Sequence, residues 1–377
     1  MSEWKTIKFR DFIKLNRGFD LPNDKMIFGD FPVVASTNIK GYHNTYKINS
    51  PCVVTGRSGS LGFVQYIEQK CTPLNTTLYV KDFKGNVPKF VYYFLQTMHL
   101  EQFNAGAGVP TLNQNHLHGY GVTIPDIDTQ KRIVDVLSTY DDLIEKNNRR
   151  IALLEKAAQE LYKEWFVRFR FPGYETAEFE NGIPKGWRIK KLADYGRVET
   201  GKTPSTENAD NYGEEYMFVK TPDMHGNVFT IQTSEYLSEC GHSTQPKKLL
   251  PSNSIMVSCI GTGGVVSINA EQAHTNQQIN SIILHDCDLL EWLFFTCKSL
   301  RETILLFGAT GATMTNLSKG KFERLKVIAP KKELILIFHD KVSPIFNEII
   351  TLMKQNQNLT KQHDLLLPRL MSGNLEV

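Results

Sequence analysis

The fold of this chain is decided by a long periodic stretch, from Ile133 to Trp165, which reads IVDVLSTYDDLIEKNNRRIALLEKAAQELYKEW. Apolar residues recur along it at alternating steps of four and three residues, which is the 3.5-residue period of a coiled-coil seam. The seam positions are Ile133, Leu137, Tyr140, Ile144, Asn147, Ile151, Leu154, Ala158, Leu161 and Trp165. The period predicts one long helix that buries a single face.

The same pattern recurs 205 positions later, between Phe338 and Leu370. Its seam positions are Phe338, Val342, Ile345, Ile349, Leu352, Asn356, Leu359, His363, Leu366 and Leu370. The alternation of steps holds at every position, so two matched helices close two similar half-chains. This spacing indicates an internally duplicated protein.

The two seams also suggest how the helices pair. If they lie antiparallel, with facing residue numbers that sum to 503, Asn147 faces Asn356. In the same register Tyr140 faces His363. A polar residue within a seam costs stability unless it meets a partner, and it then fixes the register. The alternative is two separate amphipathic helices, each packed on a globular core. Pro344, which lacks an N–H, should break or kink the second helix near its start.

Composition places the chain among ordinary soluble globular proteins. It has 377 residues, 41% hydrophobic and 22% charged, which suits two or three domains. No apolar run is long enough to span a membrane, and the six cysteines are scattered without a C-x-x-C pair. We therefore predict a cytoplasmic protein with free thiols and no bound metal. The net charge of +3 neither demands nor excludes a nucleic-acid partner.

The chain divides into two similar halves. Short β-rich runs fill it up to Pro125, with one helix expected at 88–101, and the Asp128/Thr129 pair can cap the long helix. After a linker the order repeats, with a helix expected at 289–306 and a Gly-rich loop at 308–316 that matches the loop at 105–113. We predict an α+β protein in which two tandem β-rich domains are separated and joined by two long antiparallel coiled-coil helices. The predicted divisions are a β-rich domain at 1–126, a helix at 127–167, a linker at 168–185, a second β-rich domain at 186–330 and a second helix at 331–372.

One stretch matches a catalytic motif. The run from Gly196 to Thr203, GRVETGKT, fits the phosphate-loop pattern residue for residue. A working loop needs a buried strand before it and a helix that starts at Lys202, but the preceding run is half polar and Pro204 follows. We interpret the match as chance. No paired nucleophile and base, H-E-x-x-H or G-x-S-x-G pattern occurs either, so we predict a non-catalytic chain.

The remaining chemistry lies in polar loops. Arg reaches guanine O6 and N7, Asn and Gln reach adenine N6 and N7, and glycine lets the backbone approach phosphate. The competing interpretation is that such residues fill the loops of any β-rich domain. The predicted DNA contacts are Asn38, Lys40, Arg57, Ser58, Asn75 and Thr76 in the first half, and Lys220, Asp223, His225, Thr262, Asn276 and Gln277 in the second.

Over essentially its whole length the chain resembles a type I restriction-modification specificity subunit. The order and duplication of several degenerate motifs carry the resemblance. These motifs are Trp4 and Gly186-Trp187 at the domain starts, Gly201-Lys-Thr-Pro-Ser205, the Gly-Ala loops ending at Asn113 and Asn316, Ile124-Pro125 with Gln130, and the closing run from Leu366 to Leu375. The chain departs from the family at the helix entries, where Ile335 stands in place of a second Gln.

The resemblance implies a function. Each β-rich domain would read one half of a split double-stranded DNA target. The helices would set the spacer, dock two methyltransferase (modification) subunits and, in a complete system, associate with restriction subunits. The chain would bind no cofactor, with S-adenosylmethionine, ATP and Mg²⁺ held by its partners. About 40 residues of helix span about 60 Å, which exceeds one turn of DNA, about 34 Å.

Three alternatives stay open at this point. The nearest is the specificity module of a type II-like methyltransferase. A chain of another class would be a coiled-coil scaffold whose two β-rich domains bind ligands other than DNA. An enzyme would use Lys202 to hydrolyse ATP or GTP.

Overall fold

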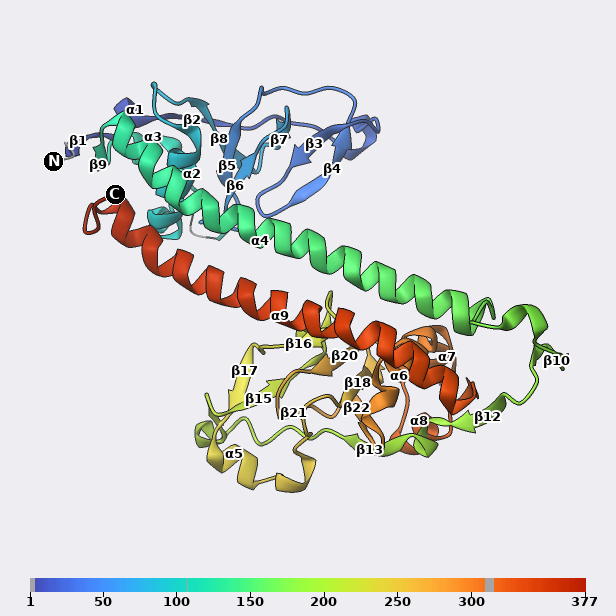
Figure 1. The fold of residues 1–377 in the computed structure, drawn as a ribbon. Coiled ribbons are helices and arrows are strands. Elements are labelled where there is room, and N and C mark those ends of the chain that lie inside the picture. Colours follow the sequence, from blue (N-terminus) through green and yellow to red (C-terminus); the bar gives the residue numbers. More distant parts are fainter. Residues whose placement is uncertain (1–3, 107, 309–314) are drawn as a thin grey trace. The chain divides into compact units, whose positions relative to one another are not determined.

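The computed structural model describes residues 4–106, 108–308 and 315–377. The chain packs as two compact units. The first unit comprises residues 1–145 and 358–377, and the second unit comprises residues 146–357. Each unit contains one β-rich repeat together with a segment of both long helices (Figure 1).

The first unit contains two small sheets and a two-stranded ribbon. One sheet has the order β2 (Lys14–Arg17), β8 (Thr77–Asp82), β5 (Cys52–Gly56), β6 (Val64–Ile67). The other has the order β4 (Ile39–His43), β3 (Phe31–Val34), β7 (Thr72–Pro73). The ribbon pairs β1 (Trp4–Lys8) with β9 (Gly121–Pro125). The helices are α1 (Phe9–Phe12), α2 (Pro88–Thr97) and α3 (Gln114–His118), with 3₁₀ turns at Asn23–Lys25 and Leu100–Phe103.

Aromatic residues fill the core of the first unit. Phe9, Phe12, Phe90 and Tyr93 are completely buried, so one face of α2 packs against the turn that follows β1. The periodicity predicted a helix over 88–101, but α2 ends at Thr97. His99 adopts a left-handed conformation with φ of 48°, which ends the helix, and a separate 3₁₀ turn follows.

The second unit repeats this plan with additional strands. Its larger sheet has the order β13 (Gly196–Thr200), β22 (Ile279–Leu284), β18 (Ile255–Ser258), β20 (Val266–Asn269), β16 (Phe229–Thr230). Its smaller sheet has the order β14 (Tyr212–Gly213), β17 (Glu235–Leu237), β15 (Tyr216–Val219), β21 (Ala273–Thr275). The two-stranded pairs are β12 (Arg188–Lys191) with β24 (Lys326–Ala329), β19 (Ile260–Gly261) with β23 (Thr315–Asn316), and β10 (Phe179–Glu180) with β11 (Ile183–Pro184).

The helices of the second repeat are α5 (Glu239–Ser243), α6 (Leu290–Ser299), α7 (Arg301–Gly308) and α8 (Lys319–Glu323). Short 3₁₀ turns lie at Tyr174–Thr176, Leu192–Asp194, Ala209–Asn211, Thr221–Met224, Pro246–Lys248 and Cys287–Leu289. The single helix expected at 289–306 is therefore two helices that meet at Leu300, the C-cap of α6. Most of the Gly-rich loop expected at 308–316 lies outside the described residues.

The duplication is visible in the strand order. The order β2-β8-β5-β6 corresponds to β13-β22-β18-β20, and β4-β3-β7 corresponds to β17-β15-β21. In each repeat an antiparallel ribbon joins the first strand to the strand that precedes a long helix. The predicted α+β fold with an internal repeat is confirmed. The additional strands β14 and β16 belong to the longer second repeat.

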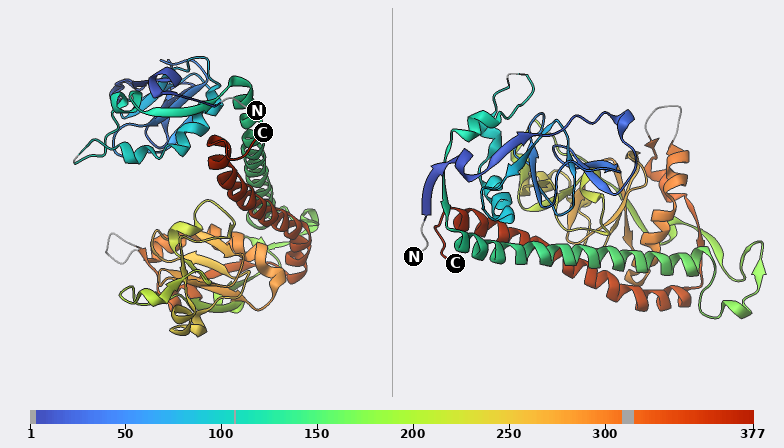
Figure 2. Two further views of the ribbon diagram at one scale, coloured as in Figure 1. Left: turned by 90° about the vertical axis from the view of Figure 1, so that its left-hand side faces the viewer. Right: turned by 90° about the horizontal axis from the view of Figure 1, so that it is seen from above.

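Two long helices follow the repeats, α4 (Ile127–Tyr162) and α9 (Lys332–Met371). Every seam position of both helices is buried or half-buried, as the 3.5-residue period predicts. Within each unit the two helix segments run in opposite directions (Figures 1 and 2). A π-helical turn, Lys163–Val167, continues α4.

The expected break at Pro344 does not occur, because α9 continues through it without interruption. Proline removes the hydrogen bond to the carbonyl four residues earlier, that of Asp340. Both residues are exposed, so water can satisfy this carbonyl.

Candidate functional site

In the first unit, three chain segments from different parts of the repeat meet at the ends of β2, β5 and β8. Gly18 N donates to Thr77 O at 3.0 Å, and a Cβ on Gly18 would lie 2.1 Å from a backbone oxygen. Only glycine therefore permits this approach. Arg57 N and Ser58 N both donate to Thr76 O, at 2.8 and 3.1 Å. The backbone thus brings together Arg57, Ser58, Asn75 and Thr76, four of the predicted contacts.

A cleft of about 270 Å³ opens beside this cluster. Buried Leu78 and Leu112 line it together with the side chains of Arg17 and Arg57. Arg57 Nη1 donates to a backbone carbonyl, Asn75 O, at 3.3 Å. The cleft is therefore lined by both guanidinium donors and apolar side chains, which suits the edge of a planar, polar ligand.

Three further amide side chains, Asn113, Gln114 and Asn115, line the same cleft. Asn113 caps α3 by accepting from Asn115 N at 3.0 Å. Ser318 stands at the N-cap of α8 in the second repeat, whereas Asn316 belongs to β23. The sequence drew attention to Asn113 only as part of a motif, and it gave no signal for Gln114.

Asn38 and Lys40 lie on a different part of the first repeat. Both are exposed, Asn38 in the turn between β3 and β4 and Lys40 on β4, and Lys40 Nζ donates to Asn23 Oδ1 at 2.6 Å. Within the residues that the structure describes, no hydrogen bond joins either side chain to Arg57. Ser36, which is outside the predicted set, contacts the Arg57 cluster directly, because its Oγ donates to Thr76 O at 2.9 Å.

In the second unit, Lys220 and Asp223 form a local structural motif. Asp223 Oδ2 accepts from Lys220 N at 2.8 Å, and its Oδ1 accepts from Ser234 N at 3.0 Å. Lys220 Nζ forms an ion pair with Glu235. Both carboxylate oxygens of Asp223 therefore bind backbone N–H groups and organise the loop.

The loop between β21 and β22 carries three consecutive amides. Asn276 Nδ2 donates to Gln278 Oε1 at 3.2 Å, and Gln277 Oε1 accepts from Thr203 Oγ1 at 2.5 Å. Gln278, which was not among the predicted contacts, also accepts from Thr221 Oγ1 at 3.4 Å. These polar groups gather at the same position in the second repeat as the Arg57 cluster in the first.

His225 and Thr262 are exposed on separate loops of the second repeat. Thr262 O accepts from Ser258 Oγ at 2.5 Å, which closes the loop after β18. No hydrogen bond among the described residues links either side chain to Asn276.

The run that matches the phosphate loop has another structural role. Residues 201–208, which follow β13, form no helix, so the required helix N-terminus is missing from this described segment. Lys202 N donates to Thr275 O at 2.9 Å, and a Cβ on Gly201 would lie 2.2 Å from the same oxygen. Gly201 therefore serves the close backbone approach that Gly18 serves in the first repeat.

The predicted register residues lie along the helix pair. In the second unit, Asn147 Nδ2 donates to Asn356 Oδ1 at 2.8 Å. In the first unit, His363 lies 3.8 Å from the Asp141 carboxylate, and its ring packs 5.9 Å from Tyr93. Tyr140 is half-buried beside Asp141. The Asn147–Asn356 bond has the register expected from the seams.

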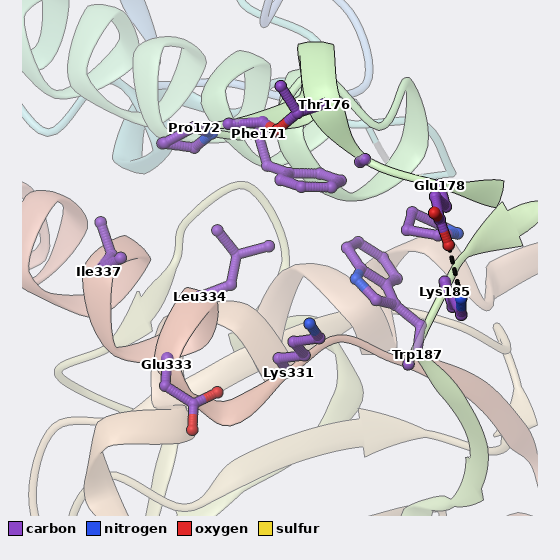
Figure 3. Close-up of a pocket in the computed structure, with 14 residues that line it drawn as sticks. Phe171, Pro172, Thr176, Glu178, Lys185, Trp187, Lys331, Glu333, Leu334 and Ile337 are labelled. Atoms are coloured by element: carbon purple, nitrogen blue, oxygen red, sulfur yellow. Dashed lines mark hydrogen bonds and ion pairs between the residues drawn. The ribbon is translucent and has the colours of Figure 1, made fainter.

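A second cavity, of about 580 Å³, lies in the second unit where the linker meets the start of α9 (Figure 3). Phe171, Trp187 and Leu334 line it, and an ion pair of 2.5 Å joins Lys185 to Glu178 at its edge. Trp187 packs against Phe171 with ring centroids 5.5 Å apart. Residues of the linker and of the start of α9 together line this pocket.

Among the residues that the structure describes, one group of side chains has metal-ligand chemistry. Asp286, Cys287 and Asp288 bring their ligand atoms within 4.8 Å of one another. Asp286, however, is paired with Lys332 at 2.9 Å, and Asp288 lies 3.7 Å from His339.

Of the helices in the described part of the chain, none is both long and apolar enough to cross a membrane.

Duplicated β-rich repeats with polar loop clusters, joined through paired long helices, define a two-repeat recognition protein. The chain belongs to the family of type I restriction modification DNA specificity domains, whose sequence model matches residues 1–156 and 184–361. The resemblance predicted from the sequence is confirmed.

Characterised relatives agree with this assignment. The specificity subunit of the type I restriction enzyme HindI from Haemophilus influenzae is 35% identical over 328 residues, which cover 71% of each chain. The MjaIX specificity subunit from Methanocaldococcus jannaschii is 28% identical over 337 residues, covering 83% of this chain and 76% of the relative. The crystal structure of a type I S subunit from M. genitalium has the same fold, with a TM-score of 0.65 at 14% identity, covering 98% and 96% of the two chains.

Proposed function

We propose that this chain is the DNA-specificity subunit of a type I restriction-modification complex and that each repeat reads one half of a bipartite target. The family match over both repeats is the observation that carries the proposal. The duplicated loop clusters support it, because polar side chains gather at equivalent positions of the two repeats, with Arg57 and Asn75 in the first and Asn276 and Gln277 in the second. In this proposal the recognition domains are residues 1–126 and 186–330.

The long helices would set the spacer between the half-targets and dock the modification subunits. Helices of 36 and 40 residues, α4 and α9, support this role, because they extend about 54 and 60 Å at 1.5 Å per residue. Their seam positions are buried or half-buried, which leaves their exposed faces available to partners. We propose two modification subunits per chain, joined by restriction subunits in a complete system.

The chain itself would perform no chemistry. Its phosphate-loop match lacks the helix that a nucleotide site needs, and its glycine serves a close backbone contact. Methyl donor, ATP and Mg²⁺ would therefore bind the partner subunits, and Lys202→Ala would leave the ATP hydrolysis of the complex unchanged.

The decisive experiment is methylome sequencing of a host that expresses this chain with its modification subunit, against a host that lacks only this chain. We expect one split motif, with two short half-targets and a fixed gap, to lose N6-methyladenine when the chain is absent. The matched control is a host that lacks only the modification subunit, which should lose the same motif. If every methylated motif survives removal of the chain, the proposal is wrong and a scaffold function becomes the better explanation.

A further inference from the structure

Backbone hydrogen bonds identify equivalent positions in the two repeats. Arg57 follows β5, and its backbone carbonyl accepts from Leu112 N at 2.8 Å. Cys259 follows β18, and its backbone carbonyl accepts from Leu317 N at 2.9 Å. The N–H of each residue also donates to the loop before the neighbouring strand, β8 or β22. Cys259 therefore occupies in the second repeat the position that Arg57 occupies in the first.

The other cationic position of the cleft differs in the same way. Arg17 ends β2 opposite Leu78, whereas Thr200 ends β13 opposite Asn280. Thr200 Oγ1 donates to Asn280 Oδ1 at 2.6 Å, so these two side chains are hydrogen-bonded to each other. Burial raises the pKa of the Cys259 thiol to about 11, so the thiol is uncharged at neutral pH. The second repeat has no cation at either position.

In the first repeat, Arg57 is the guanidinium that a ligand can engage. Arg17 already pairs with Asp20 at 3.3 Å. Arg57 has no carboxylate within ion-pair distance anywhere in residues 4–106, 108–308 and 315–377, and its side chain makes a single 3.3 Å bond to a carbonyl. A half-buried guanidinium with so few partners gains most from a planar ligand that accepts two hydrogen bonds.

Gln114, which lines the cleft, carries an acceptor without a donor. Gln114 Oε1 is buried and has no hydrogen-bond partner among the residues described. An unsatisfied buried acceptor is costly, so a ligand that supplies a donor there gains affinity. The cleft therefore combines an under-used donor, Arg57, with an under-used acceptor, Gln114.

We propose that this cleft reads a guanine–cytosine base pair within the half-target of the first repeat. Guanine presents O6 and N7 acceptors in the major groove, which match the guanidinium of Arg57, and cytosine presents an N4 amino donor, which matches Gln114 Oε1. The second repeat, with Cys259 and Thr200 at the equivalent positions, reads its half-target without a guanidinium there. This inference rests on the proposed DNA-specificity function.

The test uses the full complex with its modification subunit and duplexes that carry each base pair in turn at every position of the wild-type target. Arg57→Ala should reduce discrimination at one G·C pair of a single half-target by about 5- to 100-fold and leave the other half-target unchanged. Arg57→Lys should also lose this discrimination, because an ammonium group cannot bind two acceptors in the guanidinium geometry. Gln114→Leu should weaken discrimination at the same pair.

Lys81→Ala is the matched control, because it removes an exposed charge from β8 of the same sheet. It should leave every base preference intact, and thermal unfolding of all variants should match wild type. The proposal is overturned if Arg57→Ala weakens all sequences equally while Arg57→Lys restores binding, since Arg57 would then contact phosphate. Unchanged preferences in Arg57→Ala also overturn it. A wild-type complex without any sequence preference contradicts the proposed function itself.

Discussion

At the scale of single residues, the second repeat buries a histidine pair. His274 is completely buried, and its Nε2 lies 3.0 Å from His242 Nδ1. The His242 ring stacks on Tyr216 with centroids 4.4 Å apart. Burial, reinforced by His242, lowers the pKa of His274 to about 4, so this imidazole is neutral in the folded protein. His274 immediately precedes Thr275 and the loop of Asn276, which links it to the candidate site.

This pair predicts a pH-dependent stability. The pKa of His274 is lower in the folded state than the usual value of 6.5, so the unfolded chain binds the additional proton as the pH falls from 6.5 towards 4. The contribution of neutral His274 to the free energy of unfolding is complete above pH 6.5. About 2 kcal/mol of the free energy of unfolding should be lost between pH 7 and pH 5. Denaturant unfolding at both pH values measures the loss. His274→Gln should flatten the dependence, and an unchanged slope would contradict the assignment.

At the scale of elements, the helix pair combines a regular seam with specific polar contacts. Asn147 and Asn356 bond within the second unit, where Arg150 and Glu348 also form an ion pair. In the first unit, buried Tyr93 donates to Asp141 on α4, and His363 on α9 lies beside the same carboxylate. The Asn147–Asn356 bond has the antiparallel register expected from the seams.

A matched insertion tests the helices as a ruler. Seven residues added after Glu145 in α4 and seven after Gln357 in α9 keep the seam in phase, because both points face each other in the register. The insertion adds about 10 Å, or about three base-pair steps. Methylome sequencing should show a longer spacer between unchanged half-targets. An insertion into α4 alone is the control and should abolish methylation, whereas an unchanged spacer in the double insertion would rule out the ruler.

At the scale of the whole molecule, each repeat has its own core. Ile133 and Leu137 of α4 and Leu370 of α9 belong to the core of the first unit, whereas Ile151 and Phe338 belong to that of the second. Each repeat is therefore closed by its own segment of the helix pair, which favours independent recognition by the two repeats.

Exchange of one repeat tests this independence. If residues 1–126 are replaced by the corresponding repeat of a relative with matching seam residues, we expect one half-target to change and the other half-target and the spacer to remain. The methylated motif measures the outcome directly. Exchange of residues 186–330 is the reciprocal control, and a change in both half-targets after either exchange would show that the repeats do not read DNA independently.

Much of the fold could be predicted from local patterns. The seam from Ile133 to Trp165 and its copy from Phe338 to Leu370 required only the 3.5-residue period, because a helix records its buried face in residue spacing. Helix ends were less predictable. The break at Leu300 and the continuity through Pro344 depend on tertiary packing and solvent exposure, which the spacing does not contain.

The sequence by itself determined the duplication, the helix pair and the family, since all three are recorded in spacing and motif order. Only the tertiary structure decided which loop residues meet: Arg57 donates to the Asn75 carbonyl and lines one cleft with Gln114, Asp223 accepts hydrogen bonds within its own loop, and Lys40 binds Asn23. The physical reason is that strand pairing brings these loops together from distant parts of the chain. The composition of a loop determines its chemistry, whereas the pairing of the strands determines which other loops lie next to it.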